Sequence, residues 1–432
     1  MNVFFDTIGC RLNQSEIEIM ATQFRKAGHA VVANAKEADL VIVNTCTVTS
    51  AAASDSRQKI RQAAKKGKAH IIATGCWATL ETEAALALPG VESVVLNQDK
   101  DKLVSDYLKI TPMVFDLEPL AREPIPGEHK RTRAFIKVQD GCDNFCTFCI
   151  TKVARGKGVS RSLDEVLLDI KQAIDGGVQE IVLSGVHLGS WGKDFDKQAH
   201  LRDLIEVILR ETDVPRLRLS SLEPWDLGES FFSLWKDSRL CPHLHLPLQS
   251  GSETILRQMA RKTTPEKYLR IVEDARAVVP DVAITTDMIV GVPGETDELF
   301  DESMQFVREV NFAGGHIFPF SPRPGTAAAK FDNQIQNGIK KRRSAAMRAL
   351  FAEMTYQYQS SYVGKMVDVL WENGEEFPDR GWLMKGLTGN YLRIETKTSK
   401  NLANQITKTK INSFCEHGLF GEIEFNKKEA DE

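Results

Sequence analysis

The stretch Gly141-Cys142-Asp143-Asn144-Phe145-Cys146-Thr147-Phe148-Cys149 places three cysteines directly after the apolar, strand-like run 134–138. A structural zinc site normally has four ligands, whereas a 4Fe-4S cluster held by three cysteines keeps one iron open for another ligand. The cysteines lie among Gly, Asp, Asn and Thr rather than on a periodic apolar face, which argues against three small core residues. The C-x3-C-x2-C spacing therefore favours an iron-sulfur site, with a zinc site that borrows a distant fourth ligand as the alternative.

Composition and charge indicate an ordinary soluble protein of several domains. The 432 residues, 42% of them apolar and 26% charged, allow about three domains at roughly 150 residues each. No apolar run approaches the roughly 20 residues that a membrane helix needs, and the first residues lead into a strand pattern rather than a signal peptide. We therefore expect a cytoplasmic protein without a membrane partner, whose eight cysteines are ligands or free thiols. The net charge of −4 means that nucleic-acid binding would depend on local basic patches.

Residues 1–120 alternate between strand and helix patterns and form the first predicted domain. We expect strands over 3–7, 39–43, 69–74 and 91–96. Helices are predicted from the capping-box sequence Asn13-Gln14-Ser15-Glu16 to Gly28, up to Gly67, and over 80–88. This alternation predicts a doubly wound α/β domain with a parallel sheet.

Three further cysteines, Cys10, Cys46 and Cys76, each fall just past the end of one of the first three predicted strands. The carboxyl ends of parallel strands share one edge of an open α/β sheet, and ligands bind at that edge. Cysteines 36 and 30 residues apart in the chain can therefore meet in space and form a second three-thiolate site with an open iron. Asn13 is a candidate neighbour of this site, although we expect a plain helix N-cap there.

The strand and helix alternation resumes over residues 134–360, the second predicted domain. Its strands are expected over 135–138, 180–184, 217–220, 243–246, 283–290 and 315–318. Six βα units without an antiparallel hairpin signal predict a partial (β/α)6 barrel, whose active site lies at the carboxyl ends of its strands. The loops after the later strands supply candidate cofactor contacts, namely Gly185, Glu223, Gln249, Ser250 and Gly291.

A proline-rich linker is predicted over 121–133, between the first two domains. Its end carries Lys130, Arg131 and Arg133. These basic residues favour a solvated connector, with contact to a phosphate backbone as the alternative.

Residues 361–426, after a predicted helix over 339–362, show short strand patterns with Gly-containing turns, which predicts a small antiparallel β-barrel. Between Arg380 and Lys410, seven basic residues stand against one acidic residue, Glu395, so that the local charge is +6. Trp382 and Tyr391 interleave with these charges. The pattern suits RNA backbone tracking and base stacking, and a solvated basic face is the alternative.

Five histidines are candidate acid or base groups, although a hydrogen-bonded structural role is the commoner outcome for any one of them. They are His187, His200, His243, His245 and His316. Cys241 and Cys415 have no partners at ligand spacing, so we interpret both as free thiols. No residue is assigned a catalytic role from the sequence.

The order C-x3-C-x2-C, with Phe148 just before the third cysteine, resembles the signature of the radical S-adenosylmethionine (SAM) enzymes, in which the open iron chelates SAM. The three N-terminal cysteines, the central domain and the terminal barrel together resemble the methylthiotransferase family, whose last part is called a TRAM domain. Segments 131–142 (RTRAFIKVQDGC), 186–190 (VHLGS) and 218–224 (RLSSLEP) look like the branch that acts on N6-threonylcarbamoyladenosine at tRNA position 37. Thr151-Lys152-Val153 departs from this branch, which usually carries a proline and a tryptophan there.

The resemblance implies two 4Fe-4S clusters and SAM as cofactors, with Phe148 joining the five loop residues as SAM contacts. The cluster on Cys142, Cys146 and Cys149 would cleave SAM to a 5′-deoxyadenosyl radical that removes the hydrogen from adenine C2. The cluster on the N-terminal cysteines would hold the sulfur that becomes the methylthio group. The implied partners are the anticodon stem-loop of tRNA, with adenosine 37, and an electron donor such as flavodoxin or ferredoxin. We expect a monomer.

Three other functions stay open at this stage. Within the family, the substrate would instead be isopentenyladenosine in tRNA or an aspartate of a ribosomal protein, although the basic terminal barrel favours RNA. Outside it, the chain would be a non-catalytic, zinc-stabilised RNA-binding protein. Two sets of three cysteines argue against that reading, because zinc would want a fourth ligand in each.

Overall fold

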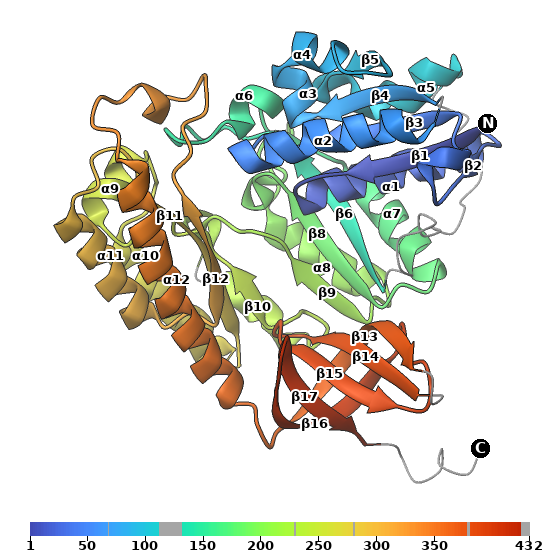
Figure 1. Ribbon diagram of the computed structural model, residues 1–432. Helices are drawn as coiled ribbons and strands as arrows, with labels where there is room; N and C mark the ends of the chain where they lie inside the picture. The colour runs from blue at the N-terminus through green and yellow to red at the C-terminus, as the bar shows by residue number, and fades with distance from the viewer. Residues whose placement is uncertain (68, 112–131, 229, 280, 378–380, 425–432) are drawn as a thin grey trace.

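The computed structural model describes residues 1–67, 69–111, 132–228, 230–279, 281–377 and 381–424. Figure 1 shows an N-terminal α/β part, a central open barrel with helices on its outside, and a small β-barrel at the C-terminal end. This confirms the predicted multidomain α/β fold class. Most of the predicted linker lies outside the described residues. Lys130 and Arg131 lie outside them, whereas Thr132 and Arg133 are described. Arg133 belongs to a strand and pairs with Glu372 of the C-terminal barrel at 2.5 Å, so it is not a solvated linker residue.

The N-terminal part is a five-stranded parallel sheet of order β2-β1-β3-β4-β5. Its strands are β1 (Asn2–Thr7), β2 (Ala30–Val31), β3 (Leu40–Thr45), β4 (His70–Gly75) and β5 (Val91–Val95). Its helices are α1 (Arg11–Lys26), α2 (Ser50–Lys66), α3 (Cys76–Leu80), α4 (Thr82–Leu86) and α5 (Leu103–Leu108). Ile17 of α1 and Leu103 of α5 pack on one face of the sheet, while Ile60 of α2 and Trp77 of α3 pack on the other. The domain is therefore doubly wound, as predicted.

Two local predictions in this part are wrong. The helix expected over 80–88 is two short helices, α3 and α4, because the backbone of Glu81 is not helical. The expected capping box does not form either. Helix α1 begins at Arg11 after Cys10 as N-cap, so Asn13 lies inside the first turn and is buried.

The central part contains six parallel strands that curve into an open barrel. They are β6 (Arg133–Asp140), β8 (Glu180–Gly185), β9 (Arg216–Leu219), β10 (His243–His245), β11 (Ala283–Val290) and β12 (Gly314–Pro319). The sheets β6-β8-β9 and β10-β11-β12 are joined by isolated parallel bridges, such as the one between Ser221 and His245. All six predicted strands are confirmed, and the two-residue strand β7 (Val159–Ser160), antiparallel to β6, was not predicted.

Helices cover the outer face of the open barrel. They are α7 (Leu163–Asp175), α8 (Leu201–Glu211), α9 (Glu253–Gln258), α10 (Pro265–Val278), α11 (Asp297–Val310) and α12 (Asn337–Ser360). The short helix α6 (Thr151–Arg155) instead contacts α3 of the N-terminal part. None of the helices within the described ranges combines the length and the hydropathy needed to cross a lipid bilayer.

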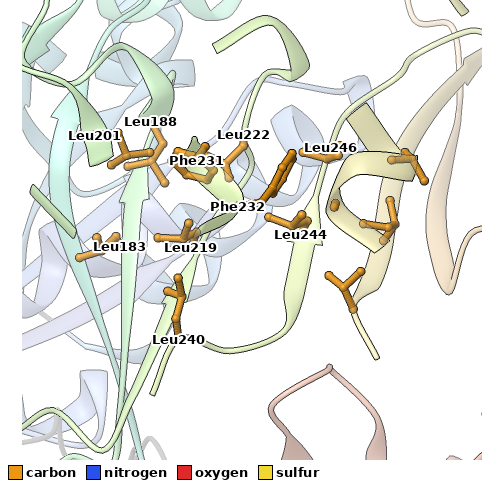
Figure 2. Packing of buried hydrophobic residues seen from close by; sticks show 14 of the residues in the cluster. Leu183, Leu188, Leu201, Leu219, Leu222, Phe231, Phe232, Leu240, Leu244 and Leu246 are labelled. Atoms are coloured by element: carbon orange, nitrogen blue, oxygen red, sulfur yellow. The ribbon is translucent and has the colours of Figure 1, made fainter. Parts of the chain in front are cut away.

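Strand alternation separates an apolar outer face of the barrel from a polar inner face. Leu183, Leu219 and Leu244 point outward and pack with Leu201 of α8 and with Phe231 and Phe232 (Figure 2). The intervening positions on β8, β9 and β10, which include Glu180, Arg218 and His245, point the other way. The helices therefore hold the barrel from outside, and polar side chains line its interior.

The C-terminal part is a closed five-stranded barrel of order β13-β14-β15-β17-β16. Its strands are β13 (Met366–Phe377), β14 (Gly381–Thr388), β15 (Arg393–Thr398), β16 (Ile406–Cys415) and β17 (Gly418–Ile423). The predicted small barrel is confirmed, with one departure, because β15 and β17 pair in parallel. Trp371, Met384 and Ile411 fill its core.

A buried ion cluster attaches this barrel to the central strands. Glu180 contacts Arg218 at 2.7 Å and Arg216 at 2.8 Å, and both guanidiniums also donate to backbone carbonyls of residues 387–389. Burial alone would raise the pKa of Glu180, but the charges of Arg218 and Arg216 lower it to about 2. The Glu180 carboxylate thus holds two arginines in place, and these arginines bind the C-terminal barrel to the central strands.

We predict that Glu180→Gln lowers the free energy of unfolding by about 3–5 kcal/mol, because it leaves two buried guanidiniums without their counter-ion. Since the carboxyl ionises at lower pH in the folded than in the unfolded chain, its contribution is present above pH 4.5 and is lost as pH falls towards about 2. Urea titrations of both proteins at several pH values measure the difference. The control Glu253→Gln removes an exposed partner of Arg257 and should cost less than about 0.5 kcal/mol. Equal losses in the two variants would contradict the prediction.

Candidate active site

The structure places three cysteines at the carboxyl edge of the N-terminal sheet. Cys10 follows β1, Cys46 follows β3 and Cys76 follows β4. The order β2-β1-β3-β4-β5 changes direction between β1 and β3, and the crevice at such a switch point is where ligands bind to open α/β sheets. The loops of Cys10 and Cys46 flank that crevice.

Glycines let these loops approach one another closely. Gly9 and Gly75 both adopt positive φ, +106° and +93°. A Cβ at Gly9 would collide with the side chain of Cys46, and one at Gly75 with the backbone of Thr45. The three loops are therefore pressed together around Cys46.

The buried thiol of Cys46 needs a cationic partner before it can ionise. Burial, with smaller contributions from Cys10 and Cys76, raises its pKa to about 11. Burial raises the pKa of the neighbouring Cys10 as well. Binding to a metal centre would replace the protons of such thiols. The donor set thus fits a metal centre that binds thiolates.

The second set of cysteines lies in the loop between β6 and α6. Its conformation is fixed by backbone hydrogen bonds from Cys142 to Gly156 at 3.1 Å and from Thr147 to Met259 at 3.1 Å. Burial raises the pKa of Cys146 and of Cys149. Arg261 lies 3.8 Å from the Cys146 sulfur and supplies positive charge there.

Neither set has the geometry of a mononuclear zinc site. Within the described ranges, no three His, Cys, Asp or Glu side chains converge enough to share one metal ion. Sulfurs bound to one zinc at about 2.3 Å must lie close together, whereas the thiolates of a 4Fe-4S cluster bind different irons and stay further apart. The described side chains therefore do not fit a mononuclear zinc site, and the assignment of both cysteine sets to clusters stays a prediction.

The six predicted SAM contacts gather around the carboxyl end of the open barrel. Phe148 packs partly buried against Met259 and Val292. Glu223 follows β9 and forms two hydrogen bonds with Arg261, at 3.1 and 2.7 Å. Gly185 is the last residue of β8, and Gln249 and Gly291 lie in the loops that follow β10 and β11.

Ser250, the sixth, is buried and already has protein partners. Its hydroxyl lies 3.0 Å from that of Ser303 and accepts a hydrogen bond from the Ser252 amide. The amide of Gly291 likewise donates to Glu295, at 2.6 Å. Both residues therefore shape their loops, and their contact with a cofactor remains a prediction.

The histidines fall into different roles. His200 is an N-cap of α8 and is structural. His187 contacts Asp226 at 2.5 Å, beside the cysteine loop. Burial alone would lower the pKa of His187, but hydrogen bonds to Asp226 and Cys142 raise it to about 9. His243, His245 and His316 belong to β10 and β12, and the rings of His245 and His316 lie 6.3 Å apart.

The two aromatics expected to stack on RNA are not free. Tyr391 lies against the ring of His243, with centroids 4.5 Å apart, and Trp382 packs on the core of the small barrel. Arg380 lies outside the described residues. Arg393, Lys397, Lys400 and Lys410 are exposed, so a basic face remains without its aromatic platform.

Sequence reasoning missed the ion pairs that join the two cysteine loops. Arg155, at the end of α6, contacts Glu16 of α1 at 2.9 Å and Asp140 of β6 at 2.8 Å, and its side chain is 2% exposed. Lys100 contacts the same Glu16 at 2.8 Å. This buried network fixes the N-terminal sheet on the central barrel.

Two asparagines extend the network to the N-terminal cysteines. Arg155 donates to the Asn13 side chain at 2.7 Å, and the Cys10 sulfur lies 3.8 Å from the same oxygen. Asn97 donates to the Cys76 sulfur at 3.6 Å and to the Ala154 carbonyl at 2.7 Å. Asn13 is therefore a neighbour of the cysteine site and not an N-cap, which corrects the sequence prediction.

Two family profiles match the chain. That of the radical SAM superfamily matches residues 136–307, and that of uncharacterized protein family UPF0004 matches residues 2–97. Among curated relatives, the threonylcarbamoyladenosine tRNA methylthiotransferases MtaB of Bacillus subtilis and Thermotoga maritima are 34% and 35% identical. These matches cover 95% and 96% of this chain and 93% and 96% of the relatives. The tRNA-2-methylthio-N(6)-dimethylallyladenosine synthase of Caldicellulosiruptor saccharolyticus is 33% identical over 96% of this chain and 91% of its own length.

Solved structures share the fold at low identity. The radical SAM methyltransferase TsrM from Kitasatospora setae, with tryptophan substrate and a SAM analogue bound, superimposes with a TM-score of 0.59 at 16% identity. That match covers 76% of this chain and 75% of TsrM.

We predict that Arg155→Met loosens the junction between the two cysteine loops. Glu16 and Asp140 lose a shared buried counter-ion, so the free energy of unfolding should fall by about 3–5 kcal/mol. Amide hydrogen exchange should rise in residues 8–14 and 44–47, and mass spectrometry of the exchanged peptides measures it. The control Arg270→Gln removes an arginine from an exposed pair with Glu266. Unchanged exchange in Arg155→Met would show that the network does not hold the junction.

Proposed function

This chain belongs to the family of radical SAM tRNA methylthiotransferases, and on that premise we propose that it methylthiolates C2 of N6-threonylcarbamoyladenosine at position 37 of tRNA. The observation that carries the proposal is the junction described above. Two loops with three cysteines each belong to different domains, and Arg155, Asn13 and Asn97 tie them together. A reaction that needs a radical at one centre and sulfur at another requires this kind of pairing.

The radical SAM superfamily uses SAM and a 4Fe-4S cluster, and we place that cluster on Cys142, Cys146 and Cys149. A second 4Fe-4S cluster on Cys10, Cys46 and Cys76 is the further part of the proposal. When bound, these groups supply one-electron cleavage of SAM and the sulfur for transfer. We also propose a flavodoxin or ferredoxin as electron donor and a monomeric enzyme.

The chain's own residues hold and shield this chemistry. Arg261 is 7% exposed, lies over the Trp225 ring at 4.5 Å, and is bound by Glu223. It thereby keeps a fixed positive charge beside Cys146. Phe148 supplies an apolar wall next to it. These contacts position the cysteine loop and keep water from its inner side.

Selection of an RNA substrate rests on the basic face of the C-terminal barrel. Exposed Arg393, Lys397, Lys400 and Lys410 would neutralise phosphates of the anticodon stem-loop. Stacking on Trp382 or Tyr391 forms no part of this proposal, since both rings already pack within the protein. A looped-out base of single-stranded RNA reaches a recessed site at low cost.

Dimethylallyladenosine-37 is the second candidate substrate, because the Caldicellulosiruptor relative named for it is 33% identical. Its N6 substituent is apolar and uncharged, whereas the threonylcarbamoyl group carries a carboxylate. The inner face of the barrel holds arginines and histidines, which suits the charged substituent. This favours threonylcarbamoyladenosine.

We predict that the anaerobically reconstituted protein holds about eight irons and eight labile sulfides, as two 4Fe-4S clusters require. Replacing Cys142, Cys146 and Cys149 together with alanine should reduce the iron content to about four. Iron and sulfide assays, with absorbance near 400 nm, measure both proteins. A fall from about four irons to none would mean that the N-terminal cysteines hold no cluster.

We predict that tRNA from a deletion strain lacks 2-methylthio-N6-threonylcarbamoyladenosine and accumulates its unthiolated precursor, as measured by mass spectrometry of digested tRNA. In vitro, Cys46→Ala should keep SAM cleavage but lose methylthiolation, whereas Cys146→Ala should lose both. The control Cys415→Ala changes a thiol on the C-terminal barrel and should restore the modification fully. Intact SAM cleavage in Cys146→Ala would refute the assignment of the radical centre, and loss of only the dimethylallyl derivative in the deletion strain would refute the substrate.

A further inference from the structure

The inner face of the open barrel is polar and rich in positive charge. Residues two apart on a strand share a face. Arg133 of β6, Arg216 and Arg218 of β9, and His243 and His245 of β10 therefore point inward, opposite to the leucines of the outer core. On β11 and β12 the same face carries Asp287 and His316, which are register partners.

Arg11 of the N-terminal domain adds a further guanidinium to this interior. It lies 5.9 Å from the ring centroid of Phe135 on β6 and 5.7 Å from that of Tyr391. Its Nη2 donates to the Tyr391 hydroxyl at 2.6 Å. Arg11 is the first residue of α1, so it lies directly next to Cys10 in the chain and at the positive end of a helix of 16 residues.

Arg11 differs from the neighbouring arginines because it has no carboxylate partner within the described ranges. Arg216 and Arg218 share Glu180, and Arg133 pairs with Glu372. Among the described residues, these four arginines therefore have two carboxylate partners between them, Glu180 and Glu372. Burial alone would raise the pKa of the Tyr391 hydroxyl, yet Arg11, Arg133 and Arg218 together lower it, which reports the excess of positive charge.

His243, a buried residue near Arg11, has one ring nitrogen without a hydrogen-bond partner among the described residues. His243 is 2% exposed and stacks on Tyr391, and its Nδ1 has no hydrogen-bond partner among the residues that the structure describes. Its Nε2 is bound to Thr285 at 3.0 Å. Such unpartnered polar atoms are rare in folded interiors and mark positions where a ligand or water completes the bonding.

Strand β12 is the edge strand of its sheet. Its residues His316 and Phe318 are exposed. His245, which lies between them and His243, contacts Asp287 at 3.4 Å. A continuous polar wall thus runs from the exposed edge at His316 to Arg11 beside Cys10.

We propose that Arg11, oriented by Tyr391, binds the carboxylate of the threonylcarbamoyl group and thereby selects the substrate base, with His245 and His316 lining the path of that group. The inference rests on the proposed function and assigns its specificity to this cradle. A guanidinium fork matches a planar carboxylate in two parallel hydrogen bonds. An apolar dimethylallyl group would leave Arg11 desolvated and unpaired, which a polar site penalises strongly.

The test uses anaerobically reconstituted holoenzyme and three synthetic anticodon stem-loops. They carry N6-threonylcarbamoyladenosine, its carboxamide analogue without the negative charge, or dimethylallyladenosine at position 37. The wild type should prefer the carboxylate over the carboxamide by roughly 10- to 100-fold in kcat/KM, the range for a hydrogen bond to a charged group. Arg11→Gln should lose about that factor in kcat/KM on the carboxylate stem-loop only. The variant should then no longer distinguish the carboxylate from the carboxamide. Arg11→Lys, which keeps the charge, should recover part of the preference.

Matched controls separate binding from folding. Iron content and SAM cleavage without RNA are measured in both Arg11 variants, and the rates on the three stem-loops are compared per assembled enzyme. Arg270→Gln removes one positive charge from an exposed helix and should leave the carboxylate preference unchanged. Equal losses on the carboxylate and the carboxamide in Arg11→Gln would overturn the role of Arg11 while the proposed function stands. A wild type that modifies only the dimethylallyl stem-loop would overturn both.

Discussion

The buried contact of Arg155 with Glu16 and Asp140 is the interaction on which the rest of the active site depends. A guanidinium with 2% exposure is tolerated only where carboxylates and hydrogen-bond acceptors surround it. One carboxylate comes from α1 and the other from β6, so the charge is satisfied only when the two domains are docked in one relative position. Each cysteine loop belongs to one of these domains. The Arg155 ion pairs therefore also set the distance between the two loops.

A second buried ion cluster fixes the end of the central barrel that contacts the C-terminal barrel. Glu180 binds two arginines that reach the carbonyls of residues 387–389, and this places Tyr391 over His243. Tyr391 itself has φ of +71°, a left-handed conformation that side chains rarely adopt and that tertiary contacts must maintain. The small barrel is therefore more than a peripheral domain, because its turn at Tyr391 packs against His243 of the central strands.

Local pattern was enough to predict the longer strands of the two α/β parts and the position of each cysteine loop. Alternation of strand and helix, and the rule that loops after parallel strands share an edge, need only short windows of sequence. The missed residues are those whose partners are far away in the chain. Arg155 and Glu16 are 139 residues apart, and Arg11 and Tyr391 are 380 apart. Tyr391 resembled an exposed stacking platform because its neighbours in sequence are basic, while its neighbours in space are another domain.

Arg11 has no carboxylate partner among the described residues, and this would affect the free energy of substrate binding. Partial burial of Arg11 without a carboxylate partner destabilises the free protein. A ligand that supplies the carboxylate would restore part of this lost stability when it binds. Binding of the charged base would then strengthen the contacts of Arg11 with Tyr391 and of α1 with the barrel. Because Arg11 follows Cys10 directly, recognition of the substituent by Arg11 and placement of the proposed sulfur site would be linked through one helix N-terminus. Selectivity and catalysis would therefore depend on the same docking of two domains, so that a base without the carboxylate is disfavoured in binding and left poorly positioned for sulfur transfer.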